Sequence, residues 1–288
     1  MIQLIINGAV LGAIYSLAAI GFVLIHNVSG SVNFSHGALV LLGAYFGITF
    51  EEWFPGRIWL AVILAMLAMA VVGIILERVA FRPLEGKPFV AVFISTLALG
   101  IAVGQAILLI WGPQPQSGQP LAEGNLTMGS ITVPVQGIVI LAVTVVAFTL
   151  QWLLTHRTVI GIKVRATADN AAVASAMGIR TTATKIAVFA IAAALAGLAG
   201  VLIAPLSFLD PSLGGIDYMI KLYIAVIIGG FGSEIGAMIG GILLGIVEVL
   251  AAAYISSSYA DAIIFGALIL LLVTRPSGLL GRHIVREA

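Results

Sequence analysis

Long apolar runs separated by short polar stretches dominate this chain. They lie near residues 2–25, 37–50, 58–76, 89–111, 138–155, 186–206, 218–231, 236–254 and 262–274. A helix needs roughly twenty such residues to cross a bilayer. The second, seventh and ninth runs are shorter, so the pattern predicts eight or nine spans. We therefore expect an all-α fold, a polytopic transmembrane helical bundle in which residues 1–288 form a single domain.

The composition supports a membrane protein. Hydrophobic residues make up 61% of the chain and charged residues only 9%, whereas about a quarter of the residues in soluble domains are charged. No basic residue precedes Arg57, and the uncharged run Ile2–Ile25 is long enough to span a membrane. We therefore expect a retained membrane helix there and not a signal peptide.

Basic residues predict the orientation, because cytoplasmic loops of membrane proteins are enriched in Lys and Arg. Three segments carry them, namely the loop with Arg78, Arg82 and Lys87, the loop 156–185, and the C-terminal tail with Arg275, Arg282 and Arg286. The loops that hold Glu51, Glu123, Asp210 and Asp261 are poor in basic residues and are expected outside. Nine spans would then place the N-terminus outside and the C-terminus in the cytoplasm.

The loop 156–185 is the most basic segment of the chain. It holds five of the thirteen Lys and Arg residues, namely Arg157, Lys163, Arg165, Arg180 and Lys185. Residues 167–178 predict a short helix with Thr167 as its N-cap, Asp169 in its first turn and Gly178 as the left-handed residue that ends it. A capped helix on the cytoplasmic face is a feature that a soluble partner can bind.

Two glycine-containing interruptions, at residues 26–37 and 229–236, predict broken helices in the two halves of the chain. Paired interruptions of this kind are typical of inverted repeats in transporters. The alternative is that both are simple loops between separate helices. The longest outer loop, 112–137, is rich in Gly, Pro and Gln, and is expected to pack as a lid or to stay mobile.

Small residues predict close helix packing. Gly232, Gly236 and Gly240 recur every four residues, a spacing that lets neighbouring backbones approach closely in membranes. The contact predicted from this spacing is either within the bundle or with a second membrane subunit.

Few polar groups lie within the apolar runs, and such groups usually face a protein interior or a cavity. Glu248 is the deepest ionisable residue, and either a structural hydrogen bond or a place in a permeation path would explain it. Short polar residues in the first interruption and in the run 89–111 are the other candidates to line a path: Asn33, Ser35, Ser95, Thr96 and Gln105.

Motifs for catalysis and for metal or nucleotide binding are absent from the sequence. No P-loop, zinc-protease motif or nucleophile elbow occurs, and there is no cysteine. His26 and His36 have no acidic or cysteine partner at ligand spacing, so we expect no metal site. An intramembrane hydrolase that uses Ser35 or Ser233 remains an alternative, but the chain is not expected to be an enzyme.

Several motifs resemble one known family. Residues 11–21 (LGAIYSLAAIG), 32–37 (VNFSHG) and 42–45 (LGAY) are similar to the H-type permease of the bacterial branched-chain amino-acid ABC importer. Further similar stretches are 81–84 (FRPL), 94–96 (IST), 161–166 (GIKVRA), 177–179 (MGI), 224–232 (IAVIIGGFG) and 235–237 (IGA). The segment 224–237 also resembles ribose-type permeases.

This resemblance implies an inner-membrane permease subunit with no cofactor of its own. It would pair with a second permease, two cytoplasmic ATPases that hydrolyse ATP-Mg, and a periplasmic binding protein that delivers the amino acid. The helix 167–178 would couple to an ATPase through Arg165, Asn170, Met177 and Gly178, although residues 169–172 (DNAA) depart from the usual Glu-Ala-Ala consensus. A permease for urea or short amides, or a stand-alone secondary transporter, is the alternative.

Overall fold

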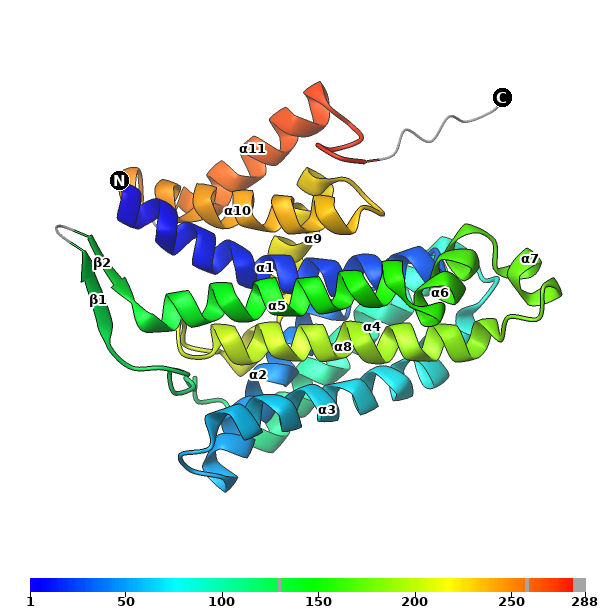
Figure 1. The fold of residues 1–288 in the computed structure, drawn as a ribbon, viewed down its shortest axis with the longest axis horizontal. Coiled ribbons are helices and arrows are strands. Elements are labelled where there is room, and N and C mark those ends of the chain that lie inside the picture. The colour runs from blue at the N-terminus through cyan, green and yellow to red at the C-terminus, as the bar shows by residue number, and fades with distance from the viewer. Residues whose placement is uncertain (129–130, 257–258, 282–288) are drawn as a thin grey trace.

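All nine apolar runs fold as helices (Figure 1). The structure is a computed structural model, and it describes residues 1–128, 131–256 and 259–281. The helices are α1 (Ile2–Ser29), α2 (His36–Trp53), α3 (Ile58–Leu76), α4 (Phe89–Trp111), α5 (Val135–Arg157), α6 (Val159–Asp169), α7 (Ala171–Ala176), α8 (Thr181–Ile203), α9 (Ile216–Gly229), α10 (Glu234–Tyr254) and α11 (Ala260–Thr274). A π-helical turn η1 (Glu77–Phe81) and two 3₁₀ turns, η2 (Arg82–Leu84) and η3 (Pro211–Leu213), complete the helical segments that are described.

The helix lengths agree with the prediction of a transmembrane bundle. Within the described residues, six helices are long and apolar enough to span a bilayer, namely α1, α3 with its continuation to Leu84, α4, α5, α8 and α10. The helices α2, α9 and α11, which come from the three short runs, have 18, 14 and 15 residues. The described part of the bundle is therefore all-α and polytopic, with six helices of spanning length and the three shorter helices α2, α9 and α11.

The helices run back and forth between two ends of the bundle (Figure 1). One end, here called the acidic end, carries the N-terminus, the last turn of α2 with Glu51, and the loop with Glu123. The opposite end, here called the basic end, carries α6 and α7. Of the predicted basic tail, Arg275 is described, whereas Arg282 and Arg286 lie outside the described residues.

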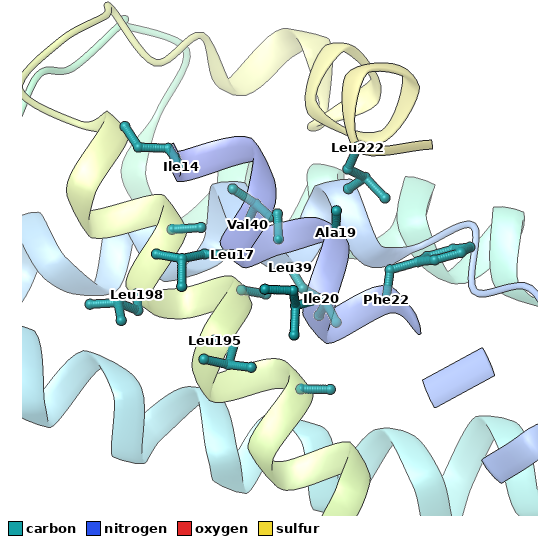
Figure 2. Close-up of a cluster of buried hydrophobic side chains, with 14 of the residues drawn as sticks. Ile14, Leu17, Ala19, Ile20, Phe22, Leu39, Val40, Leu195, Leu198 and Leu222 are labelled. Carbon is teal, nitrogen blue, oxygen red and sulfur yellow. The ribbon is translucent and has the colours of Figure 1, made fainter. Parts of the chain in front are cut away.

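Two helices form the centre of the bundle. In the most apolar windows of α1 and α8, 89% and 72% of the residues are buried, against 22% for α4 and α5. A helix that is apolar on all sides must be surrounded by other helices or by lipid. Figure 2 shows the resulting contact, in which Leu17 and Ile20 of α1 lie among Leu39 of α2 and Leu195 and Leu198 of α8.

Glycines bring α10 close to α1 and α9. A Cβ placed at Gly241 would lie 2.5 Å from Ser16 Oγ, and one at Gly236 would collide with the backbone of Gly229. Gly236 and Gly240 both lie against the backbone of α9 of the same chain. The prediction for Gly232 is wrong, because this residue precedes α10 and has a φ of 83° in the turn before it.

The interruptions predicted from the sequence are connections between separate helices. His26 lies inside α1, which continues to Ser29 and ends at the left-handed Gly30, so the first connection is 30–35. The second, 230–233, is a short turn between α9 and α10. The two predicted interruptions contact each other, since Asn27 Nδ2 near the end of α1 donates to Gly232 O at 3.2 Å. In addition, Gly37 at the start of α2 lies against Gly215 of the 204–215 connection.

The loop 112–137 contains a two-stranded antiparallel hairpin that the sequence did not predict. Strand β1 (Asn125–Met128) pairs with β2 (Ile131–Pro134), with Asn125 opposite Pro134. The preceding part of the loop is tied to the 204–215 connection by the backbone pair Gln116–Leu209. Gln136 Oε1 accepts a hydrogen bond from Leu121 N at 2.7 Å, which closes the base of the hairpin.

Candidate functional site

The basic loop folds as two short helices, and one predicted cap is wrong. The helix α6 starts at Thr158, whose hydroxyl accepts a hydrogen bond from Gly161 N at 3.1 Å. Thr167 is buried within α6, where its hydroxyl donates to Lys163 O. The N-cap of α7 is Asn170, whose Oδ1 accepts hydrogen bonds from Ala172 N and Val173 N, both at 3.1 Å.

Gly178 ends α7, as the sequence predicts. Its φ is 84°, a left-handed conformation that glycine adopts without a steric penalty. Ile179 N donates to Ala174 O at 3.0 Å, and Gly178 N donates to Ser175 O at 3.0 Å. Such bonds satisfy the last carbonyls of a helix and reverse the chain, so α7 is a capped turn that projects from the basic end.

The tip of this loop is exposed and apolar. Met177 is 79% exposed and Val173 is 58% exposed. A cavity of about 430 Å³ lies between Ile160 of α6, Met177 and the start of α8. Exposed apolar groups framed by basic residues are typical of a surface that binds another protein.

The four predicted coupling residues have different structural roles. Arg165 is exposed on α6, and its guanidinium Nη1 donates to Thr155 O at the end of α5. It therefore ties the loop to the bundle. The other three lie at the tip of the loop. Asn170 caps the start of α7, Met177 is exposed at its end, and Gly178 reverses the chain after it.

Three of the predicted path residues lie near one another. Asn33 and Ser35 are buried in the first connection, and Ser35 Oγ donates to Asn33 Oδ1 at 2.6 Å. Gly100 of α4 packs against Ser35, since a Cβ there would lie 3.2 Å from Ser35 Cα. Thr96, one turn earlier on α4, is buried and donates to Val92 O at 2.9 Å.

The other predicted path residues are not part of this group. Ser95 is half-buried and Gln105 is exposed on α4. Glu248 lies on α10 and pairs with Lys221 of α9, with 2.5 Å between Nζ and Oε1. Glu248 thus has an ion-pair partner, and its place in a permeation path stays a prediction.

Sequence reasoning missed two charged groups. Lys221 lies in the first half of α9. It was not counted among the charges at membrane depth, although a lysine in a membrane helix is itself a signal. Glu77 is 1% exposed in the π-helical turn η1, and neither of its carboxylate oxygens has a hydrogen bond within the described part of the chain. Turns of this type occur often at functional sites.

Comparison with known proteins identifies the family. A family model described as "Branched-chain amino acid transport system / permease component" matches residues 4–273. The "High-affinity branched-chain amino acid transport system permease protein LivH" of Salmonella typhimurium is 33% identical, over 99% of this chain and 97% of the relative. LivH of Escherichia coli K12 matches equally well.

Two further relatives extend the comparison. The permease protein BraD of Pseudomonas aeruginosa, which carries the same high-affinity branched-chain description, is 32% identical over 99% of this chain and 97% of its own length. The "Ribose import permease protein RbsC" of Bacillus subtilis is 27% identical over 66% of this chain and 60% of the relative. No solved structure matches the chain. With a family model that covers nearly the whole bundle and relatives that are permeases, the chain belongs to the branched-chain amino acid transport system permease family.

Proposed function

We propose that this chain is a permease subunit of an ABC importer that carries branched-chain amino acids across the bacterial inner membrane. Its full-length similarity to LivH and BraD supports this cargo. A second permease subunit would complete the path, two cytoplasmic ATPases would supply energy from ATP-Mg, and a periplasmic binding protein would deliver the amino acid. The chain itself would bind no cofactor.

The surface formed by α6 and α7 supports the ATPase contact. An ATPase needs a rigid element through which closure of its nucleotide sites can move the bundle. The helix α7 is capped at Asn170 and closed at Gly178, and it presents Val173 and Met177 outward. Arg165 connects the loop to the carboxyl end of α5, so a displacement of α7 would be passed to a spanning helix.

The path would involve Asn33, Ser35 and Thr96, because Asn33 and Ser35 are hydrogen-bonded in a buried helix connection and Thr96 lies buried on α4, one turn from the Gly100 that packs against Ser35. Ser95 and Gln105 are on the more exposed side of α4. They would line the path only if the second permease subunit packed against that side. Alternating access would then arise from movement of the two permeases relative to each other.

The distribution of charge supports the orientation. With the basic end in the cytoplasm, as the positive-inside rule requires, α7 faces the ATPases. The acidic end, with the hairpin β1–β2, would face the periplasm and receive the binding protein. The N-terminus would then be periplasmic and the C-terminus cytoplasmic.

The decisive experiment reconstitutes the chain with its genomic partner subunits and measures ATP hydrolysis stimulated by loaded binding protein. Gly178→Val forces a β-branched residue into a left-handed conformation and should abolish the stimulation. Gly178→Asn is the matched control, because Asn tolerates this conformation, and it should keep most of the stimulation.

Equal stimulation in Gly178→Val and in the unchanged chain would refute the coupling role. Uptake of leucine by the chain alone, without ATP, would instead identify a secondary transporter. Uptake of urea or acetamide in preference to leucine, isoleucine and valine would refute the proposed cargo.

A further inference from the structure

A cavity of about 300 Å³ lies between α1, α9, α10 and the 204–215 connection. Its volume is at the lower end of the range for small-molecule sites. One wall is apolar, with Leu11 of α1, Ile203 of α8, and Leu206 and Leu213 of the connection. This cavity is separate from the group formed by Asn33, Ser35 and Thr96.

Opposite charges face the same cavity. Lys221 Nζ and Glu248 Oε1 are 2.5 Å apart, and the two side chains are only 22% and 15% exposed. Glu248 lies six residues before the end of α10, about 9 Å along the helix. Charges at such depth are costly and usually mark a substrate or ion pathway.

The ion pair leaves binding capacity unused. Glu248 Oε2 is buried and makes no hydrogen bond of normal geometry within the described residues, and the Tyr15 hydroxyl is the other polar group that interacts with this carboxylate. Lys221 Nζ lies 5.7 Å from the centroid of the Tyr15 ring, a distance at which a cation is attracted to the aromatic face. An ammonium has three donors, so the lysine can keep this contact while it binds a second anion.

Two further carboxylates, those of Asp217 and Asp210, line the cavity. Hydrogen bonds from the Ser212 hydroxyl, and then from its backbone N–H, hold the pKa of Asp210 below its usual value. Asp210 is thus an anion at neutral pH, and the cavity has more negative than positive groups. This charge distribution favours ligands that carry an ammonium group.

A free amino acid with an aliphatic side chain has the matching chemistry. Its α-carboxylate would bind Lys221, its ammonium would bind Glu248 Oε2, and its side chain would lie against the apolar wall. A ligand without one of the two charges would separate Lys221 from Glu248 and leave one of them unpaired, which is costly when both are largely buried. Urea and amides have no carboxylate to offer Lys221.

We propose that the Lys221–Glu248 pair is a recognition site for the zwitterionic group of aliphatic α-amino acids on their way through the permease. This inference rests on the proposed function for the class of cargo. The ligand must open an existing ion pair, so the site binds weakly and releases readily. It therefore selects for zwitterions without retaining them.

Ligand binding tests this site directly. Saturation-transfer NMR is recorded on the assembled transporter in nanodiscs, without binding protein. Leucine should give a signal, whereas leucinamide, which has no carboxylate, and 4-methylpentanoate, which has no amine, should give at least fivefold less. The double variant Lys221→Met/Glu248→Gln removes both charges together, so neither is left unpaired, and it should lose the leucine signal.

The matched control is Glu51→Gln. It makes the same carboxylate-to-amide change at the acidic end but outside the cavity, and it should bind leucine like the unchanged chain. In proteoliposomes, the double variant should lower leucine uptake at least tenfold, while ATP hydrolysis stimulated by loaded binding protein stays within twofold.

Two results separate this proposal from the proposed function. A leucine signal or uptake rate unaffected by the double variant would overturn the recognition site, whatever the ATPase does. Equal signals from leucine, leucinamide and 4-methylpentanoate would overturn it as well. If the unchanged complex shows no stimulated ATP hydrolysis, the proposed function fails, and the NMR comparison still decides whether the cavity recognises zwitterions.

Discussion

Gly12 of α1 lies against the backbone of Gly241 of α10, and neither position has space for a side chain. A Cβ at Gly12 would lie 2.6 Å from Gly241 O, and one at Gly241 would lie 2.6 Å from Ser16 N. Since lipid offers no hydrophobic driving force between helices, such close backbone contact is a main source of helix association in membranes.

Gly12→Leu should therefore lower the stability of the bundle by about 1–3 kcal/mol or more, because the added atoms force the two backbones apart. The measurement is the midpoint of thermal unfolding of the purified protein in detergent. Gly266→Leu is the control, since a Cβ at Gly266 of α11 meets no atom within 4 Å. Equal midpoints for both variants would contradict close packing of α1 on α10.

The cap of α7 can be tested by replacing Asn170. Asn170→Ala removes the acceptor for Ala172 N and Val173 N and should destabilise this short helix by about 0.5–2 kcal/mol. Hydrogen exchange at residues 171–176 should become faster, while the spanning helices keep their protection. Asn170→Asp preserves the acceptor, so exchange should remain slow; if it becomes as fast as in the alanine variant, the capping role is wrong.

A buried hydrogen bond links α2 to the 204–215 connection. Tyr45 is fully buried, and its hydroxyl donates to Leu209 O at 3.0 Å. Tyr45→Phe should cost about 1 kcal/mol, the usual net value of an intramolecular hydrogen bond, because Leu209 O keeps its other donor, Gln116 N. Tyr254→Phe, at a position 63% exposed, should leave the unfolding midpoint unchanged. An unchanged unfolding midpoint in Tyr45→Phe would show that this hydrogen bond contributes nothing to stability.

The absence of cysteine makes the proposed orientation easy to test. Single cysteines are introduced at Glu123, in the loop before the hairpin, and at Met177, at the tip of the basic end. A membrane-impermeant maleimide should label Glu123→Cys in cells with a permeabilised outer membrane, and Met177→Cys only in inside-out vesicles. The reverse pattern would invert the proposed topology and remove the ATPase contact at α7.

The Lys221–Glu248 pair also predicts a specific pattern of stabilities. Removing one partner of a largely buried ion pair leaves the other charge uncompensated, at a cost of about 3–5 kcal/mol, whereas replacing both is often nearly neutral. Lys221→Met should therefore destabilise the bundle more than Lys221→Met/Glu248→Gln does. Thermal unfolding of the two variants decides this, and a larger loss in the double variant would show that the two residues are not coupled.

Several features were predictable because they depend on local sequence. Each apolar run becomes a helix, since a segment in lipid must satisfy its own backbone hydrogen bonds. The end of α7 at Gly178 was predictable because only glycine adopts the left-handed conformation readily. The three short runs likewise became the three short helices α2, α9 and α11.

Other features depend on where each helix ends and on which of its sides the neighbouring helices cover. Asn170, and not Thr167, caps α7 because α6 extends to Asp169 and buries Thr167 inside it. Gln105 was grouped with the path residues but faces outward, because a helix that is apolar on all sides carries no sequence signal of which side its neighbours cover.

The sequence by itself determined a membrane bundle, the position of its helices and a basic loop capped by glycine, because lipid and backbone geometry act on each segment separately. Only the tertiary structure decided which charges meet. Lys221 and Glu248 are 27 residues apart in the chain, and they pair because glycines let α9 and α10 pack closely enough to bring the two side chains to one cavity.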